Sequence, residues 1–247
     1  MNARALAVVT AYAEALRDCV GPDEVVGVYL TGSAVSGEFD ESVSDIDVLT
    51  VHRSLGERLP QRAIEGLHEE LVAVLPWAER LEVAYLPRTG LRAWGVQGQC
   101  LSWSAAGLRL GESHVASDDV LAAHLYAVVV AGLPTREVFP PVSGELFARQ
   151  TQEYLADLLS RPAPGDDGGV AADRIANIAR CLQRLATGGL GSKSSALRWW
   201  AARDEELAAV VQVVGPARRG EVEAQKRCVQ GLAMVVERAK TASTDLP

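Results

Sequence analysis

Long hydrophobic runs are missing from this sequence of 247 residues. No apolar stretch approaches the ~18 residues that a membrane-spanning helix requires. The first residues lead into a helical pattern that Glu14, Arg17 and Asp18 interrupt, and this segment lacks the apolar core of a secretory signal. With 48% hydrophobic and 23% charged residues, the composition is that of a globular protein. We therefore expect a cytoplasmic protein that has no membrane partner.

Cysteine is also scarce. The four cysteines lie far apart in the sequence and form no CxxC or CxH pair: Cys19, Cys100, Cys181 and Cys228. This spacing excludes a recognisable set of zinc ligands. We expect the thiols to be reduced, as is usual in the cytoplasm.

Positive charge is scarce in the first two thirds of the chain. Up to Ser160 the sequence has 11 Arg, no Lys and 22 acidic residues, a balance of −11, whereas the remainder has a balance of +3. Nucleic-acid affinity depends on Lys and Arg side chains that neutralise phosphates, so the acidic part argues against a nucleic-acid partner. Such a surface would attract a cation, although it would equally serve as an ordinary solvated face.

One break in composition divides the chain. The segment 161–169 holds two Pro, three Gly and two Asp between apolar periodic stretches, which predicts an interdomain loop. We therefore expect a first domain over 1–160 and a second domain over 161–247.

The periodicity of apolar residues differs on the two sides of this break. Before it, short apolar or alternating runs predict strands at 25–31, 45–51 and 81–86. Helical periods there fall at 3–19, 59–75, 118–131 and 145–159. After it, only helical patterns remain, at 170–187, 193–214 and 218–240. The fold class is therefore α+β, with a small mixed sheet flanked by helices, followed by an all-α helical bundle.

The most informative segment is LTGSAVSGEFDESVSDIDVL. A predicted buried strand runs into Gly32 and Ser33, where the backbone can approach a ligand closely. If a helix begins there, its free N–H groups and the Ser33 hydroxyl can hold a phosphate. The next predicted strand carries Asp45 and Asp47, and the period of two in a strand places both carboxylates on one face.

Two neighbouring carboxylates repel each other unless a cation lies between them. Magnesium binds one or two carboxylates, retains water and takes its remaining ligands from substrate phosphates. A Gly-Ser pair alone is generally only a turn, and an Asp pair alone is generally a solvated strand end. Together, on consecutive predicted strands, they indicate a site for a metal–nucleotide complex.

These residues resemble the signature of the polymerase-beta-like nucleotidyltransferases, in which a Gly-Ser pair precedes a DxD pair. The longer segment LTGSAVSGEFDESVSDIDVLTV is similar to the aminoglycoside O-nucleotidyltransferases that adenylylate streptomycin and spectinomycin. Two further segments resemble that family, ERLEVAYL at 79–86 and NIARCLQRLATGGLGSK at 177–193. The likeness therefore extends over most of the chain.

The resemblance implies a magnesium-dependent transfer of AMP from ATP to a substrate hydroxyl, with release of pyrophosphate. It implies that Asp45 and Asp47 hold two magnesium ions and that Glu82 is the catalytic base. It assigns binding of the ATP triphosphate to Gly32, Ser33, Ser44, Arg180 and Lys193. The site would lie in the cleft between the two domains of a monomer.

Several of these residues also make chemical sense by themselves. Glu82 lies on a predicted strand whose outward face could meet the Asp pair, although it also fits an exposed strand glutamate. Lys193 follows the Gly-rich loop 188–191 in a chain with three lysines, which favours a phosphate contact over a surface position at a helix N-terminus, where a cation is disfavoured. Arg180 lies in an apolar helical stretch, and it either binds phosphate or pairs with Asp173.

The part of the site that would bind the acceptor departs from the family. Before the helical segment at 177, the streptomycin enzymes carry an acidic residue and a histidine that face the acceptor, and ungapped alignment places Val170 and Asp173 there. We expect Asp166 and Asp173 to supply negative charge to the acceptor instead. The resemblance also implies that Trp103 packs against the acceptor, although tryptophan is equally a common core residue.

The acidic first domain favours a cationic acceptor, such as an aminoglycoside or aminocyclitol antibiotic, and hence a role in antibiotic resistance. One alternative is the same chemistry on a different natural product in a biosynthetic pathway. Another is a toxin–antitoxin type of nucleotidyltransferase that modifies a protein. The presence of both aspartates and of Glu82 argues against a degenerate regulator that only binds nucleotide.

Overall fold

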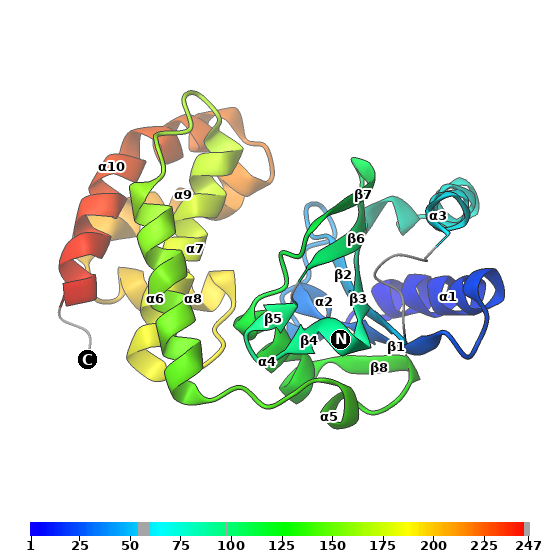
Figure 1. Cartoon of the computed structure of the whole chain (residues 1–247). Helices are drawn as coiled ribbons and strands as arrows, with labels where there is room; N and C mark the ends of the chain where they lie inside the picture. The colour runs from blue at the N-terminus through cyan, green and yellow to red at the C-terminus, as the bar shows by residue number, and fades with distance from the viewer. Residues whose placement is uncertain (54–59, 97, 245–247) are drawn as a thin grey trace. The chain divides into compact units, whose positions relative to one another are not determined.

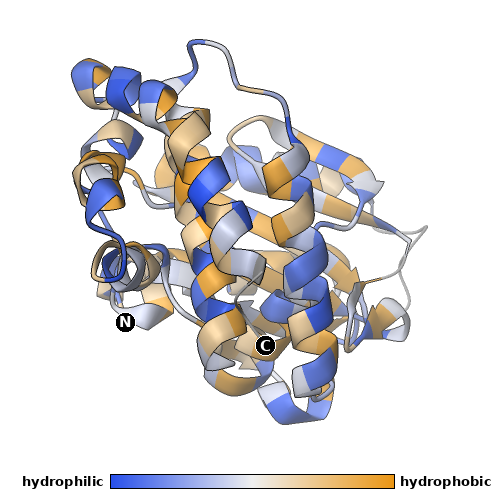
Figure 2. Ribbon diagram, turned by 90° about the vertical axis from the view of Figure 1, so that its left-hand side faces the viewer, coloured by the Kyte–Doolittle hydropathy of each residue, from blue (hydrophilic) through white to orange (hydrophobic). Residues whose placement is uncertain are grey.

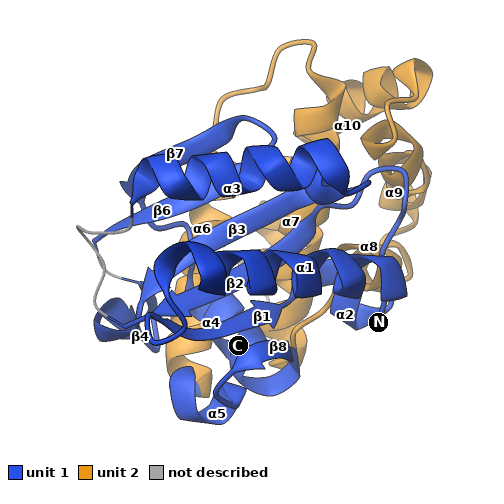
Figure 3. Cartoon of the chain, turned by 90° about the vertical axis from the view of Figure 1, so that its right-hand side faces the viewer, with its two compact units in different colours: residues 1–143 blue, residues 144–247 orange. Residues whose placement is uncertain are grey.

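The structure is a computed structural model that describes residues 1–53, 60–96 and 98–244. The chain forms two compact units, Met1–Ser143 and Gly144–Pro247 (Figure 1, Figure 3). The first unit is built on a β-sheet, and the described residues of the second unit form helices and loops only. Among the described residues, every helix is too short or too polar to cross a membrane.

A six-stranded mixed sheet forms the centre of the first unit, with the strand order β7-β6-β3-β2-β1-β8. The strands are β1 (Val25–Leu30), β2 (Ile46–His52), β3 (Leu81–Pro87), β6 (Gln99–Ser104), β7 (Gly107–Glu112) and β8 (Val128–Gly132). The pair β2–β3 is parallel, and the other neighbouring strands of this sheet are antiparallel. A separate two-stranded sheet consists of β4 (Leu91–Arg92) and β5 (Gly95–Val96).

Helices cover both faces of this sheet. The helical segments of the first unit are α1 (Ala3–Val20), α2 (Gly32–Ser36), α3 (Gln61–Val74), η1 (Ala78–Arg80), η2 (Arg88–Gly90), α4 (Ser117–Tyr126) and α5 (Thr135–Val138). Helices α1 and α3 lie over one face (Figure 3) and share a core with Val28, Val48 and Val83. On the other face, α4 and the end of α5 pack with Tyr29 and Leu49. Because strand residues alternate between faces, β1, β2, β3 and β6 contribute to both cores.

The fold class predicted from the sequence is confirmed, and the three predicted strands are β1, β2 and β3, each within one residue at either end. The prediction of a helix over 118–131 is wrong in its second half. Helix α4 ends at Tyr126, and the β-branched run that begins at Val128 pairs with β1 as strand β8. A short apolar run does not by itself distinguish a helix from a buried strand. Position 59 of the helix predicted over 59–75 lies outside the described residues.

The second unit is a bundle of helices around α7. The helices are α6 (Gly144–Ser160), α7 (Gly168–Thr187), α8 (Lys193–Ala201), α9 (Glu205–Arg218) and α10 (Val222–Thr244). Hydrophobic and hydrophilic residues recur along the same helices (Figure 2), as expected where each helix buries one side. The sequence predicted a single helix over 193–214. The structure instead has a break there, because Asp204 caps α9 by accepting a hydrogen bond from the Glu206 N–H at 3.1 Å.

The segment 161–169, predicted as an interdomain loop, connects α6 to α7 within the second unit, and its last two residues begin α7. The two units divide after Ser143, whereas the sequence predicted a boundary after residue 160. The reason is that α6 contributes Leu155 and Leu158 to the core of the second unit. Hydrophobic periodicity identifies such a helix but does not reveal which core it joins.

A buried arginine holds this loop in place. Arg174 on α7 is 7% exposed. Its guanidinium donates at distances between 2.7 and 2.9 Å to the carbonyl oxygens of Leu158, Arg161 and Pro162. Carbonyl groups at the end of a helix have no partner within the helix, so Arg174 satisfies groups at the end of α6 and fixes the turn into α7.

A buried polar cluster lies between the sheet and helices α1 and α3. The hydroxyls of Tyr12 and Thr50 are 2.8 Å apart, and His68 Nε2 lies 2.7 Å from the Tyr85 hydroxyl. The His68 ring stacks on the Trp103 ring with centroids 4.3 Å apart. Burial lowers the pKa of His68 to about 3, so this imidazole is neutral at pH 7.

Protonation of His68 should limit the stability of the protein in acid. Its pKa is about 3 in the folded protein against an ordinary value of 6.5, so the unfolded chain binds the extra proton between these values. The contribution of His68 to the free energy of unfolding is constant above pH 6.5. Below that pH, the free energy of unfolding falls by about 1.4 kcal/mol per pH unit towards pH 3. Urea unfolding at a series of pH values should show a shallower acid loss for His68→Gln. The exposed His114→Gln variant should follow the wild type, and an unchanged slope in His68→Gln would contradict this assignment.

Candidate active site

The turn at Gly32 brings the Gly-Ser pair and the Asp pair together. Gly32 has a φ of 64° and begins the short helix α2. A Cβ at this position would overlap the Asp47 carboxylate, so that carboxylate lies directly against the Gly32 backbone. The N–H and the hydroxyl of Thr31 both donate to the Asp47 carbonyl oxygen, at 2.9 and 3.2 Å. Position 32 therefore requires glycine for its backbone conformation and for this close approach.

Asp47 and Glu82 are direct neighbours across the parallel pair β2–β3. Ile46 and Leu81, which precede them on their strands, are fully buried against α1 and α3. Because strand residues alternate, Asp47 and Glu82 share the other face. Asp45 directly precedes β2 and is exposed, as is Glu82, whereas Asp47 is half-buried. The sheet thus gathers the three predicted acidic residues at one end of two adjacent strands.

The loop before Asp45 is fixed by its own hydrogen bonds and by a residue of the next strand. Ser44 Oγ accepts from the Asp40 N–H at 3.0 Å, and the Ser44 N–H donates to the Asp40 carbonyl at 2.8 Å. Arg80, which directly precedes β3, donates to the Glu41 carbonyl at 2.5 Å. The loop that presents Asp45 is therefore tied to the strand that carries Glu82.

Trp77 supports this connection. It is the only non-glycine residue with positive φ among the described residues, at 78°. The guanidinium groups of Arg4 and Arg80 each lie 5.2 Å from its ring centroid, within the range of a cation–π contact. Sequence reasoning missed Trp77 and Arg80, because their contacts with Arg4 and Glu41 join segments that are distant in the chain.

The acidic residues suit a magnesium ion that arrives with its nucleotide. Within the described part of the chain, no three His, Cys, Asp or Glu side chains form a metal site by themselves. Magnesium, however, needs only one or two carboxylates when water and phosphate oxygens complete its coordination. The contact between Asp47 and Gly32 puts one carboxylate at the turn where phosphate is expected. Asp45 and Asp47 therefore fit magnesium chemically without forming a complete protein cage.

A cation cluster, consisting of Arg180, Lys193 and Arg218, lies in the second unit. Lys193 Nζ and Arg218 Nε donate to the same oxygen, Asp173 Oδ1, at 2.8 and 2.9 Å. These contacts join α7, α8 and α9. Arg180 is two turns beyond Asp173 on α7, and its charge lowers the pKa of Lys193.

Burial and neighbouring charges both shift the pKa values of Lys193 and Asp173. Burial lowers the pKa of Lys193, Asp173 opposes that effect, and the charges of Arg218 and Arg180 add to it. Burial raises the pKa of Asp173, but Lys193 and Arg218 together outweigh burial, so the pKa of this carboxyl lies below its ordinary value. Asp173 is therefore ionised at neutral pH.

These contacts change the role predicted for Asp173. Its carboxylate holds two cations of its own unit, so it has no uncompensated charge to offer an acceptor. Asp166 is exposed in the turn before α7, and its predicted contact with the acceptor stays a prediction. Arg218 was not predicted. The available signal was the Arg-Arg pair at 218–219, next to a predicted helix boundary.

Trp103 belongs to the core of the first unit and not to the acceptor site. It pairs with Val83 across β3 and β6, so it points to the face opposite Glu82. It is 9% exposed and stacks on His68. The spacing of this tryptophan in the sequence was compatible with either role, and the strand register decides between them.

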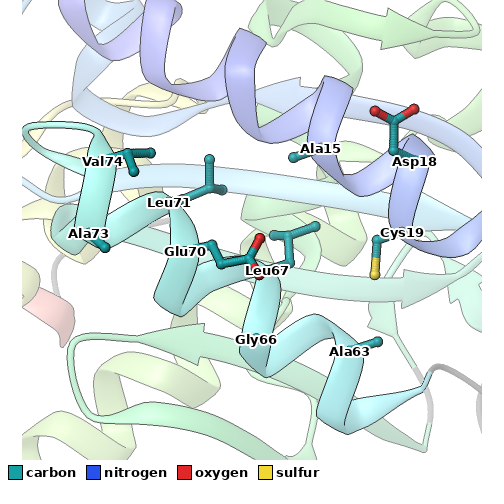
Figure 4. A pocket seen from close by; sticks show the side chains of 10 residues that line it. All are labelled: Ala15, Asp18, Cys19, Ala63, Gly66, Leu67, Glu70, Leu71, Ala73 and Val74. Carbon is teal, nitrogen blue, oxygen red and sulfur yellow. The ribbon is translucent and has the colours of Figure 1, made fainter.

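A groove of about 860 Å³ lies between α1 and α3. Figure 4 shows its lining, which is apolar around Leu67 and Leu71 and carries the carboxylates of Asp18 and Glu70. Both helices cover the face of the sheet opposite Asp47 and Glu82. This groove is therefore separate from the acidic residues of the candidate site.

Residues 11–101 match the family model of the nucleotidyltransferase domain. This range includes the Gly32 turn and all three acidic residues of the candidate site. This part of the first unit is therefore similar to a nucleotidyltransferase domain. A comparison with curated proteins finds no significant match in sequence.

The fold of the chain as a whole is similar to that of a solved enzyme. This enzyme is spectinomycin adenyltransferase AAD(9) from Enterococcus faecialis, in a crystal structure with ATP and spectinomycin. The TM-score is 0.66, and the match covers 96% of this chain and 100% of that chain. The sequence identity is 15%, so this similarity establishes the fold.

Replacement of Gly32 by Ala should displace the Asp47 carboxylate. The Cβ would overlap this group, and the positive φ would cost about 1–2 kcal/mol in the free energy of unfolding. Gly37→Ala is the matched control, because Gly37 also has a positive φ but no atom within 4 Å of a Cβ. We expect urea unfolding to show a similar loss in both variants, and crystal structures to show Asp47 moved only in Gly32→Ala. An unmoved carboxylate in Gly32→Ala would refute the contact.

Proposed function

We propose that this protein transfers the adenylyl group of ATP to a hydroxyl of a cationic small molecule and releases pyrophosphate. The observation that carries this proposal is the parallel register of β2 and β3, which puts Asp47 beside Glu82 and next to the Gly32 turn. The match of residues 11–101 to the nucleotidyltransferase domain supports the reaction class. The similarity in fold to an adenyltransferase crystallised with ATP supports the nucleotide.

Asp45 and Asp47 would hold magnesium through their carboxylates. Magnesium supplies positive charge that stabilises the attacking and leaving oxygens of an in-line displacement at phosphorus. The two aspartates orient the nucleotide through this ion, and the Gly32 turn leaves room for the phosphate oxygens to approach the backbone.

Glu82 would accept the proton of the attacking hydroxyl. As the hydroxyl oxygen forms a bond to the α-phosphorus, the bond from that phosphorus to the oxygen shared with the β-phosphate breaks. Pyrophosphate leaves with the electrons of that bond, and Glu82 takes the proton. The exposure of Glu82 suits this role, because an acceptor must reach it from solvent.

The remaining nucleotide-binding residues would act on the triphosphate. Ser33 lies in the first turn of α2 and Ser44 in the loop fixed by Asp40, so both are near the ends of the strands that carry the acids. Arg180 and Lys193 belong to the second unit, and their positive charges suit phosphate oxygens.

A cationic acceptor is favoured by the charge of the first unit. The chain up to Ser160 has 22 acidic and 11 basic residues, and such a surface raises the local concentration of a cation. The fold is shared with an enzyme that was crystallised with spectinomycin. We therefore place aminoglycosides and aminocyclitols first among the acceptors to be tested.

The direct test is a screen of pyrophosphate release. The full-length protein is incubated with Mg–ATP and a panel of aminoglycosides, aminocyclitols and other amino-bearing natural products. Pyrophosphate should appear only when an acceptor is present, and mass spectrometry should find the acceptor with one added AMP. Binding of Mg–ATP without turnover of any member of the panel would count against the proposed transfer.

Asp47→Asn should abolish turnover without unfolding the protein. The substitution keeps the size of the side chain and removes one of two metal-binding charges. Asp23→Asn, at an exposed turn at the end of β1 opposite to Gly32, controls for the loss of a charge. Turnover near that of the wild type, with an unchanged melting curve, would exclude Asp47 as a metal ligand.

Glu82→Gln should separate the base from the metal ligands. Mg–ATP binding should persist, because both aspartates and the phosphate contacts remain. Turnover should fall by roughly 10²–10⁴ in kcat, the usual contribution of a positioned acid–base group. Glu79→Gln, an exposed neighbour, should retain full turnover. Loss of Mg–ATP binding in Glu82→Gln would make Glu82 a metal ligand, and undiminished turnover would give it no chemical role.

A further inference from the structure

An aromatic–cation cluster holds the loop that leads to Asp45. It consists of Arg4, Phe39, Glu41, Trp77 and Arg80. The Trp77 ring lies at its centre, with the Arg4 and Arg80 guanidinium groups each 5.2 Å from the ring centroid and the Phe39 ring centroid 5.8 Å away. These distances are in the range of cation–π and aromatic contacts. Three segments of the first unit that are distant in the sequence therefore meet at one ring.

Both arginines of the cluster also bind Glu41 in the loop. Arg4 forms an ion pair with the Glu41 carboxylate at 3.4 Å, and Arg80 donates to the Glu41 carbonyl oxygen at 2.5 Å. The side chains of Arg4 and Glu41 are 71% and 57% exposed, and an ion pair this exposed stabilises a structure little by itself. The Trp77 ring contacts both guanidinium groups, so it restricts the two groups that hold Glu41 from two sides.

Trp77 has a backbone conformation that a large side chain disfavours. Its φ is 78° and its ψ is −6°, in the left-handed region. The Arg80 N–H donates to the Trp77 carbonyl oxygen at 3.0 Å, so the same turn places Arg80 beside the ring. Glycine would adopt this turn without strain. Strain of this kind persists only where surrounding contacts impose it, and it is frequent at functional sites.

The loop transmits its position to Asp45 and not to Asp47. Asp40 closes a turn, because its carboxylate and carbonyl oxygens accept hydrogen bonds from the N–H groups of residues 42–44 at 2.8 to 3.1 Å. Asp45 directly follows this turn. Asp47 instead lies within β2, with its carboxylate against the Gly32 backbone. A displaced loop would therefore move Asp45 and leave Asp47 in place.

We propose that Trp77 is a positioning residue for the metal. Through Arg4 and Arg80 it holds the loop where the Asp45 carboxylate can share an ion with Asp47. Magnesium demands near-ideal octahedral geometry, so a small displacement of one carboxylate lowers its affinity. The cluster thus sets the metal affinity of the site without contacting the substrate. This inference rests on the proposed function, which supplies the metal and its nucleotide.

The test measures Mn²⁺ binding by Trp77→Gly in the full-length protein. Glycine keeps the turn and removes the ring. Mn²⁺ uses the same oxygen ligands as magnesium, and its free concentration is measured by electron paramagnetic resonance in the presence of α,β-methylene-ATP, which cannot transfer AMP. Mn²⁺ should bind about three- to tenfold more weakly to Trp77→Gly. Trp77→Phe, which keeps an aromatic ring, should bind it more tightly than Trp77→Gly does.

Asp45→Asn distinguishes positioning from a general loss of structure. If Trp77 acts through Asp45, Trp77→Gly should weaken Mn²⁺ binding no further in a protein that already carries Asp45→Asn. A full additional loss in the double variant would overturn the inference. With an acceptor that is turned over, Trp77→Gly should need more magnesium for half-maximal rate and recover kcat at saturating magnesium.

The outcomes separate this inference from the proposed function. A folded Trp77→Gly protein that binds Mn²⁺ as tightly as the wild type would overturn the inference and leave the function standing. Mn²⁺ binding that depends on Trp77, in a protein that transfers AMP to no acceptor, would support the inference and contradict the function. A wild type that binds no Mn²⁺ with the analogue would overturn both.

If Trp77→Gly does not fold, Arg4→Gln decides. It removes one cation from the ring and one contact of Glu41, at an exposed side chain. Arg62→Gln is the matched control, because Arg62 is an exposed arginine on α3 outside the cluster. Weaker Mn²⁺ binding by Arg4→Gln alone would support the inference, and equal binding by the two variants would overturn it.

Discussion

The parallel pairing of β2 with β3 is the constraint on which the candidate site depends. It sets Asp47 beside Glu82, while Ile46 and Leu81, one residue earlier on each strand, are buried on the other face. A shift of one residue in this register would move a carboxylate into an apolar core, where an unpaired charge is very costly. The core between the sheet and helices α1 and α3 therefore fixes the chemistry on the opposite face.

Contacts outside the motif hold its parts in place. Gly32 permits the close approach of the Asp47 carboxylate, and Arg80 ties the loop before Asp45 to the start of β3. The Asp47 carboxylate lies against the backbone of Gly32, and the Arg80 guanidinium donates to the backbone carbonyl of Glu41. Asp47 and Glu82 thus lie on strands, and Asp45 lies in a loop that hydrogen bonds hold in place. Such contacts restrict the geometry of a site before a ligand binds.

The second unit contributes charge of the opposite sign. Its helices bury an apolar core around α7, and outside that core Lys193 and Arg218 pair with Asp173. Asp173 satisfies part of that charge and keeps it in one place. The acidic residues proposed for the metal and the basic residues proposed for the phosphates therefore reside in different units.

The sequence by itself determined the strands that carry the motif, the fold class and the acidic residues, because these follow from local periodicity and from the short spacing of Gly32, Asp45 and Asp47. Only the tertiary structure decided what distant segments do. The strand register places Trp103 in the core, and Asp173 pairs with Lys193 and Arg218. The predicted interdomain loop lies within one unit because α6 packs in the core of the second unit. Periodicity records which side of an element is buried, but it holds no information on which other element does the burying. Contacts between residues far apart in the chain arise only when the elements pack.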